Sequence, residues 1–136
     1  MNTMAREQYG LEMNPGPFGM NSRPALIGYK YAEAQGKGGE YHTAVMDAYW
    51  RDAKTIDDLA VLGDLVAGIG LDQAAFLAAL TDSALIEQVD DDIALAQEYG
   101  INGVPALVFA NKYLVSGAQP YPVLQQVIAQ IQGEAA

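Results

Sequence analysis

A short apolar run behind a proline constrains the fold of this chain more than any other feature. Residues 106–110 are all apolar, and they directly follow Gly103, Val104 and Pro105. An uninterrupted run with β-branched and aromatic side chains is typical of a strand that is covered on both faces. Proline has no main-chain N–H to contribute to a sheet, so it belongs at the start of such a strand. The sequence therefore predicts a loop that leads into a buried strand.

A second strand and a helix complete this part of the chain. Asn111 and Lys112 separate the first run from residues 113–117, and a two-residue separation between strand-like runs predicts a tight hairpin. A helix is predicted next, because four apolar residues recur at helical spacing: Leu124, Val127, Ile128 and Ile131. Residues 100–132 are therefore expected to form a strand–strand–helix unit.

The preceding region, residues 21–99, has the apolar spacing of helices throughout. Ser22 is predicted to be the N-cap of the first of these helices. Asp72, and either Asp82 or Ser83, are the predicted N-caps of two later ones. The expected fold is therefore α+β and mostly helical.

The N-terminal segment, residues 1–20, is predicted to be a short helix followed by a loop rich in glycine and proline. Leu11, Met13 and Phe18 are expected to anchor this loop on the core. All three regions are expected to pack as one compact unit, because 136 residues suit a single domain.

Three of these features resemble a known family: the Gly103–Pro105 motif before an apolar strand, the segment VSGAQP at Val115–Pro120, and the closing amphipathic helix. The chain is similar to the DsbA/FrnE-like thiol oxidoreductases and to their relative, the glutathione-dependent 2-hydroxychromene-2-carboxylate isomerase. Asn21 and Ser22 resemble the opening of that family's helical insertion. The resemblance covers residues 5–132. It implies a truncated thioredoxin-like (DsbA-like) fold, in which a helical insertion-type subdomain precedes a β-β-α tail.

The resemblance also implies a binding site. In the family the Val-Pro bond of this motif is cis, and the main chain before the proline pairs with an extended substrate or with glutathione. The substrate-binding residues are then Gly103, Val104 and Pro105, and the contact is β-augmentation. A purely structural turn is the alternative for these three residues.

The chain contains no cysteine. Oxidoreductases of the resembled family use a Cys-x-x-Cys pair in a front half, and the resemblance implies that this chain starts after that half. No catalytic residue, metal site or cofactor is therefore expected, and glutathione enters only under the alternative function. The favoured function is a non-catalytic, homodimeric remnant that binds a peptide or a protein. The alternative is a thiol- or glutathione-dependent oxidoreductase or isomerase whose nucleophile comes from a cofactor or a partner chain.

The apolar strand also predicts how two copies associate. Its edge lacks the charges and extra prolines that protect natural edge strands. A homodimer is expected through Ala106, Leu107, Val108, Phe109 and Ala110, with an extended peptide or a redox partner protein as the other candidate partner. Coverage of the same edge by residues 1–20 is the competing arrangement.

Other polar and aromatic residues favour structural roles. His42, the only histidine, is expected to be exposed or capping. Asp90, Asp91 and Asp92 would point about 100° apart on a helix, which prevents all three from binding one ion. Five aromatic residues are expected to be core or interface anchors rather than a stacking platform: Tyr29, Tyr31, Tyr41, Tyr49 and Trp50.

The charge balance narrows the class of partner and the location. Seventeen acidic residues against seven basic ones give a net charge of −10, and no basic stripe is present, so nucleic acids and anionic membranes are disfavoured as partners. No apolar stretch approaches the roughly 20 residues of a membrane span. Residues 1–10 lack the apolar core of a signal peptide. A cytoplasmic location is therefore expected.

Overall fold

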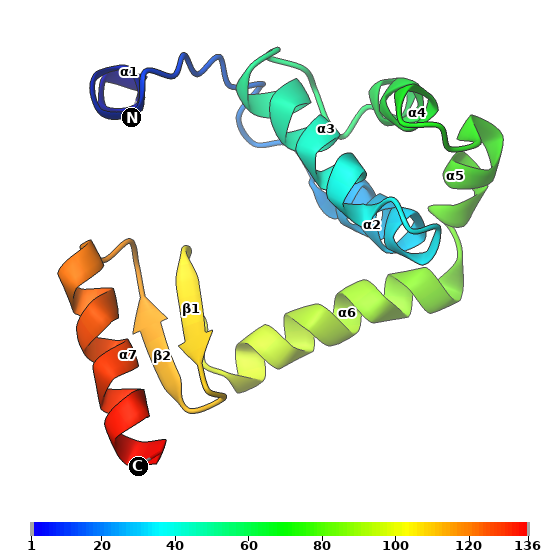
Figure 1. Cartoon of the computed structure of the whole chain (residues 1–136). Coiled ribbons are helices and arrows are strands. Elements are labelled where there is room, and N and C mark those ends of the chain that lie inside the picture. The colour runs from blue at the N-terminus through cyan, green and yellow to red at the C-terminus, as the bar shows by residue number, and fades with distance from the viewer. Residues whose placement is uncertain (1, 136) are drawn as a thin grey trace. The chain divides into compact units, whose positions relative to one another are not determined.

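The computed structural model describes residues 2–135, which are mostly helical (Figure 1). The elements are α1 (Asn2–Tyr9), α2 (Arg23–Ala34), α3 (Gly38–Trp50), α4 (Leu59–Gly68), α5 (Gln73–Ala79), α6 (Ser83–Glu98), β1 (Ala106–Phe109), β2 (Tyr113–Ser116) and α7 (Tyr121–Ala135). The α+β, mostly helical fold class predicted from the sequence is confirmed. No helix among the described residues is long and apolar enough to cross a membrane.

Contacts divide the chain into two compact units, which we call unit 1 and unit 2. Unit 1 extends to Asp90, and unit 2 starts at Asp91, so the division falls inside α6. From the sequence we expect residues 1–20, 21–99 and 100–132 to pack as one compact unit, and these bounds remain a prediction. Helix α6 continues past its last buried residue, Val89.

The core of unit 1 is built from four helices, α2 to α5. Its most deeply buried large side chains are Tyr41, Phe76, Leu62 and Val66. The rings of Tyr41 and Phe76 lie 5.9 Å apart between centroids, and Tyr31 meets Phe76 edge-on at 6.0 Å. Tyr41 is therefore a core residue, as expected, and its ring packs tilted against its neighbours rather than in a stacked platform.

Aspartates cap the helices α4, α5 and α6, because a carboxylate accepts the free N–H groups of a first turn. Asp58 accepts from the Ala60 N–H at 2.9 Å, and Asp72 accepts from the Ala75 N–H at 2.7 Å. Asp82, rather than Ser83, caps α6.

The N-cap expected at Ser22 is only partly correct. Ser22 occupies the position before α2, but its side chain makes no capping bond. The side chain of Asn21 takes that role and accepts from the Arg23 N–H at 3.0 Å. Serine and asparagine are similarly frequent N-caps, so the sequence could not decide between these neighbours.

The N-terminal segment is held on the end of α3 by its main chain rather than by its apolar side chains. The N–H groups of Asn14 and Gly16 each donate at 2.7 Å, to the carbonyls of Trp50 and Tyr49 respectively. The expectation that Leu11 and Phe18 anchor this loop is wrong, because both are exposed. Hydrogen bonding of the loop backbone takes the place of apolar anchoring.

Unit 2 contains the hairpin and α7. β1 and β2 pair antiparallel, with Ala106 opposite Ser116 and Phe109 opposite Tyr113. Ala110 and Asn111 have positive φ angles in the connecting turn. Between residues 91 and 134 no side chain is fully buried. The expectation of a strand covered on both faces is therefore wrong for the described residues.

Candidate functional site

The predicted binding loop lies between α6 and β1 and is open to solvent. The Val104–Pro105 peptide bond is cis, and Val104 is 91% exposed. A side chain at Gly103 would meet no atom within 4 Å, and its φ is not left-handed. Nothing in the local structure therefore requires glycine at this position, and the main chain of the loop is accessible to solvent.

Alternate main-chain groups of β1 face away from β2. The Gly117 N–H donates to the Pro105 carbonyl at 2.8 Å, which makes these residues a hydrogen-bonded pair. Bonding alternates along an antiparallel ladder, so the main-chain groups of Ala106 and Val108 point toward the open side of β1. Within the described residues, no third strand joins this sheet.

The side chains beside this edge are apolar and half-exposed. Successive side chains of a strand point to opposite faces. Leu107 is 43% exposed on one face, and Val108 is 36% exposed on the other. Neither face of β1 is therefore closed by the other described residues of unit 2.

The outer edge of β2 differs from that of β1, because one of its main-chain carbonyls already accepts a hydrogen bond. Ser116 stands opposite Ala106, so its carbonyl points outward, and the side chain of Gln119 donates to it at 2.8 Å. β2 is also tied to α7, because Tyr113 donates a hydrogen bond to Glu134 and Lys112 lies 3.2 Å from the same carboxylate. Figure 1 shows α7 alongside β2, with β1 on the far side of the hairpin.

These contacts shift the ionisation of both partners. The hydrogen bond from Tyr113, followed by that from Lys112, holds the pKa of Glu134 below its usual range. Glu134 in turn raises the pKa of Lys112. Both charged forms are stabilised together, at a contact between the turn end of the hairpin and α7.

The remaining predicted residues do not form a catalytic cluster. His42 is exposed and makes no hydrogen bond or ion pair with the described residues. Asp90 pairs with Arg23 at 2.7 Å on the surface. Among the described residues, no group of histidine and acidic side chains could hold a metal ion.

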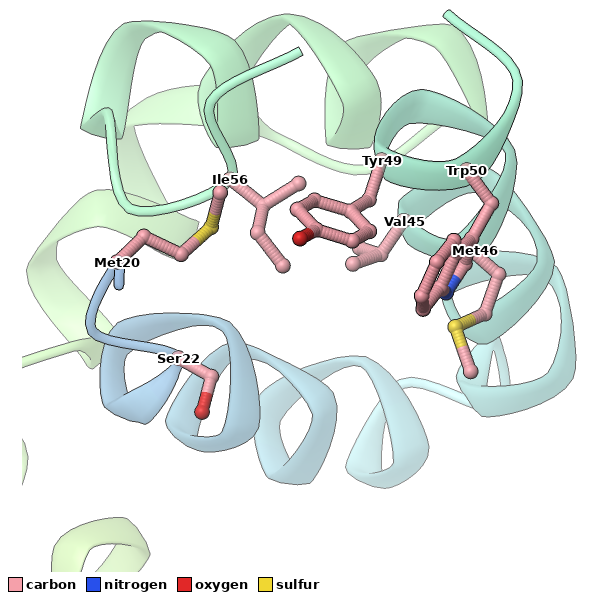
Figure 2. Close-up of a pocket in the computed structure, with 7 residues that line it drawn as sticks. All are labelled: Met20, Ser22, Val45, Met46, Tyr49, Trp50 and Ile56. Atoms are coloured by element: carbon pink, nitrogen blue, oxygen red, sulfur yellow. The ribbon is translucent and has the colours of Figure 1, made fainter. Parts of the chain in front are cut away.

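An apolar pocket between α2 and α3 was not predicted from the sequence. It has two adjoining parts of about 210 and 260 Å³, and both are lined by Val45, Met46 and Ile56. Figure 2 shows Tyr49 and Ile56 in the middle of the first part, with Met20 at one end and Met46 and Trp50 at the other. The helical spacing of Val45, Met46 and Tyr49 signals an apolar face, but no pattern shows that the face remains open.

Comparison with known proteins places these features in a family. The sequence profile of the DSBA-like thioredoxin domain matches residues 2–129. The chain is 35% identical over 96 residues to the thiol:disulfide interchange protein DsbA of Azotobacter vinelandii, covering 68% of this chain and 45% of the relative. It is 28% identical over 129 residues to the uncharacterized protein YwbO of Bacillus subtilis, covering 90% and 62%. It is 31% identical over 97 residues to 2-hydroxychromene-2-carboxylate isomerase of Pseudomonas putida, covering 71% and 47%.

A solved structure agrees with the fold. A selenomethionine structure of 2-hydroxychromene-2-carboxylate isomerase matches 98% of this chain and 64% of its own, with a TM-score of 0.78 and 22% identity. The chain spans between 45% and 62% of the length of the three curated relatives above. Because the family profile matches nearly every residue, this chain belongs to the DSBA-like thioredoxin domain family.

Proposed function

We propose that this chain is a non-catalytic binding protein of the DSBA-like family that forms a homodimer through β1. The observation that carries the proposal is the open edge of β1, flanked by half-exposed Leu107 and Val108. Unpaired strand edges with apolar side chains favour pairing with another chain. The blocked Ser116 carbonyl on β2 favours β1 as the strand that pairs.

In the proposed dimer, two copies of β1 pair across a two-fold axis, and the two hairpins form one sheet. Antiparallel pairing of β1 with its copy gives a four-stranded sheet, whereas a two-stranded hairpin is marginally stable by itself. Ala106 and Val108 direct their main-chain groups toward the partner. Leu107 and Val108 lose solvent contact on opposite faces of the new sheet.

The Gly103–Pro105 loop supplies the binding function in this proposal. The exposed main chain at Val104 has no partner among the described residues. It accepts an extended peptide by β-augmentation, which needs no catalytic side chain. Thiol–disulfide exchange requires a thiolate, and this chain supplies none.

Sedimentation velocity at micromolar concentration tests the dimer. Wild type should sediment as a dimer and Val108→Lys as a monomer, with helical circular dichroism retained. Leu114→Lys is the matched control, because Leu114 stands opposite Val108 on β2 and is similarly exposed, at 40%. A monomeric wild type, or equal loss of dimer in both variants, would contradict pairing through β1.

The alternative is a thiol- or glutathione-dependent oxidoreductase or isomerase. It is favoured by the exposed Val104 main chain together with relatives named as a thiol:disulfide interchange protein and an isomerase. In that case glutathione or a partner chain supplies the nucleophile. Disulfide reduction assays with glutathione, with and without this chain, decide between the two: acceleration by this chain supports the enzyme, and an unchanged rate supports the binding protein.

A further inference from the structure

Phe18 is an aromatic side chain with no cover at all. Its exposure equals that of an extended peptide, the highest value among the exposed large hydrophobic residues of the described chain. A phenylalanine in water forgoes the burial free energy that normally keeps this residue inside. Exposed aromatic residues that are also held in place mark contact surfaces.

The segment that carries Phe18 is fixed on both sides. Gly16 donates to the Tyr49 carbonyl at 2.7 Å, and a side chain at Gly16 would lie 2.3 Å from the Lys54 carbonyl, so the loop is packed closely there. The Tyr49 hydroxyl donates to the Pro17 carbonyl at 3.4 Å. Gly19, with a φ of 81°, then turns the chain toward Met20. Phe18 is therefore presented at the tip of a supported turn.

The apolar pocket of Figure 2 adjoins this tip, because both share residues. Tyr49 lines the pocket and bonds to Pro17, and Met20 lines it two residues after Phe18. A cavity of about 150 Å³ with apolar walls is large enough to bind benzene in another protein. The 210 Å³ part of this pocket is therefore large enough for a phenyl ring. Methionine side chains such as Met20 and Met46 adapt readily to such a ring.

We propose that Phe18 of one copy inserts into the pocket lined by Met20, Met46 and Trp50 of a second copy, and that the second copy returns the same contact. In a two-fold interface both partners use the same surface. When Phe18 of the first copy enters the pocket of the second, the same axis places Phe18 of the second copy in the pocket of the first. The loop beside the tip carries Arg51, Asp52 and Lys54, and its mixed charges avoid strong like-charge repulsion between copies. This contact lies wholly in unit 1 and does not rest on pairing through β1.

The test uses Val108→Lys as background, which removes the proposed β1 contact and leaves the Phe18 contact, whose self-association is followed above the micromolar range. Phe18→Asp should weaken self-association on the order of 100-fold, because two buried rings are lost per dimer and each is worth at least about tenfold. Leu11→Asp is the matched control, since it makes the same kind of change, apolar to acidic, at another exposed residue of the same segment. Light scattering from micromolar to several hundred micromolar protein gives the mass of each variant.

A mixing experiment identifies the pocket as the partner of Phe18. Met46→Lys places a charge in the pocket wall at a side chain that is already 45% exposed, so folding is preserved. In the Val108→Lys background, Phe18→Asp and Met46→Lys should each be monomeric alone. Mixed in equal amounts they should form a heterodimer, because one ring still meets an intact pocket and the introduced carboxylate faces the introduced ammonium group at the other contact. Failure of the mixture to associate would overturn the assignment of this pocket.

Trp50, the only tryptophan, provides a local readout because it lines the pocket. Its emission should shift to shorter wavelength as protein concentration rises, and Phe18→Asp should abolish the shift. An emission that is independent of concentration, or an unchanged mass for Phe18→Asp, would overturn the proposal. The β1 dimer is judged separately: Phe18→Asp with Val108 intact should still be a dimer, and a monomer there contradicts only the β1 contact.

Discussion

The hydroxyl of Tyr41 in α3 donates a hydrogen bond to the main-chain carbonyl of Ala25 in α2, at 2.8 Å. Both residues are buried, and burial raises the pKa of Tyr41 above its ordinary value, so the phenol stays protonated and remains a donor. This bond joins the two helices that form the pocket. It also gives a hydrogen-bond partner to the hydroxyl, the only polar group of the Tyr41 side chain, which otherwise packs among apolar groups.

Removing this hydroxyl should destabilise unit 1. Tyr41→Phe leaves the ring packing unchanged and deletes one buried hydrogen bond, so the free energy of unfolding should fall by about 1–2 kcal/mol. Urea unfolding followed by Trp50 fluorescence measures the change. Tyr29→Phe is the control, because Tyr29 is only half-buried and its hydroxyl pairs with Glu33 near the surface. An equal loss in both variants would show that burial of the Tyr41 bond contributes nothing extra.

Gly28 should not tolerate a methyl group. A Cβ there would lie 2.5 Å from the Tyr41 hydroxyl and 2.7 Å from the Phe76 ring. Gly28→Ala should therefore cost about 1–3 kcal/mol of stability through overpacking. Gly39→Ala, in α3 with no atom within 4 Å, should be neutral or slightly stabilising. Thermal unfolding of the two variants compares them, and a stable Gly28→Ala protein would contradict this packing.

The hairpin of unit 2 should loosen in acid. The folded-state pKa of Glu134 lies below its ordinary value of 4.5, so its contribution is complete above that value and is lost as the pH falls through the folded-state pKa. The pKa of Lys112 is raised above 10.5, so its contribution is lost only as the pH rises through that higher value. Amide exchange of β2 should therefore differ between wild type and Glu134→Gln at neutral pH and converge at low pH. A difference that persists at low pH would argue against the carboxylate as its source.

Two substitutions at the N-terminus of α6 test which residue caps this helix. Asp82→Ala removes the acceptor of the Ala84 and Leu85 N–H groups and should cost about 1 kcal/mol. Ser83→Ala should change stability little, because alanine suits a helix better than serine and the cap remains. Chemical denaturation of both variants tests the assignment, and the reverse order would place the cap at Ser83.

Local features of this fold could be predicted from the sequence because they depend on neighbouring residues. Asp72 caps its helix as expected, and a hairpin forms where the sequence predicts it, although its loop, residues 110–112, begins one residue earlier than the predicted Asn111. The family resemblance and the fold class are both confirmed by the comparisons. Each of these signals is contained within a few positions or one helical repeat.

Long-range features could not be predicted in the same way. The sequence predicts Phe18 as an anchor because aromatic side chains are usually buried. The structure shows that the main-chain hydrogen bonds of Asn14 and Gly16 hold the loop instead. The open faces of Leu107 and Val108 depend on which surfaces approach them, which periodicity does not encode. The substrate-binding role of Gly103–Pro105, the homodimer and the cytoplasmic location remain predictions.

The lack of a fully buried side chain from Asp91 to Glu134 has a consequence for folding cooperativity. Regions with few buried apolar contacts open locally at low free-energy cost, independently of the rest of the chain. Amides in the first half of α6, near buried Val89, should therefore exchange with solvent more slowly than those in its second half. Anything that binds the closed form of unit 2 raises its stability in proportion to the logarithm of the binder's concentration. In the proposed β1 dimer, the rigidity of unit 2 would therefore depend on protein concentration, and dilution alone should be enough to loosen it.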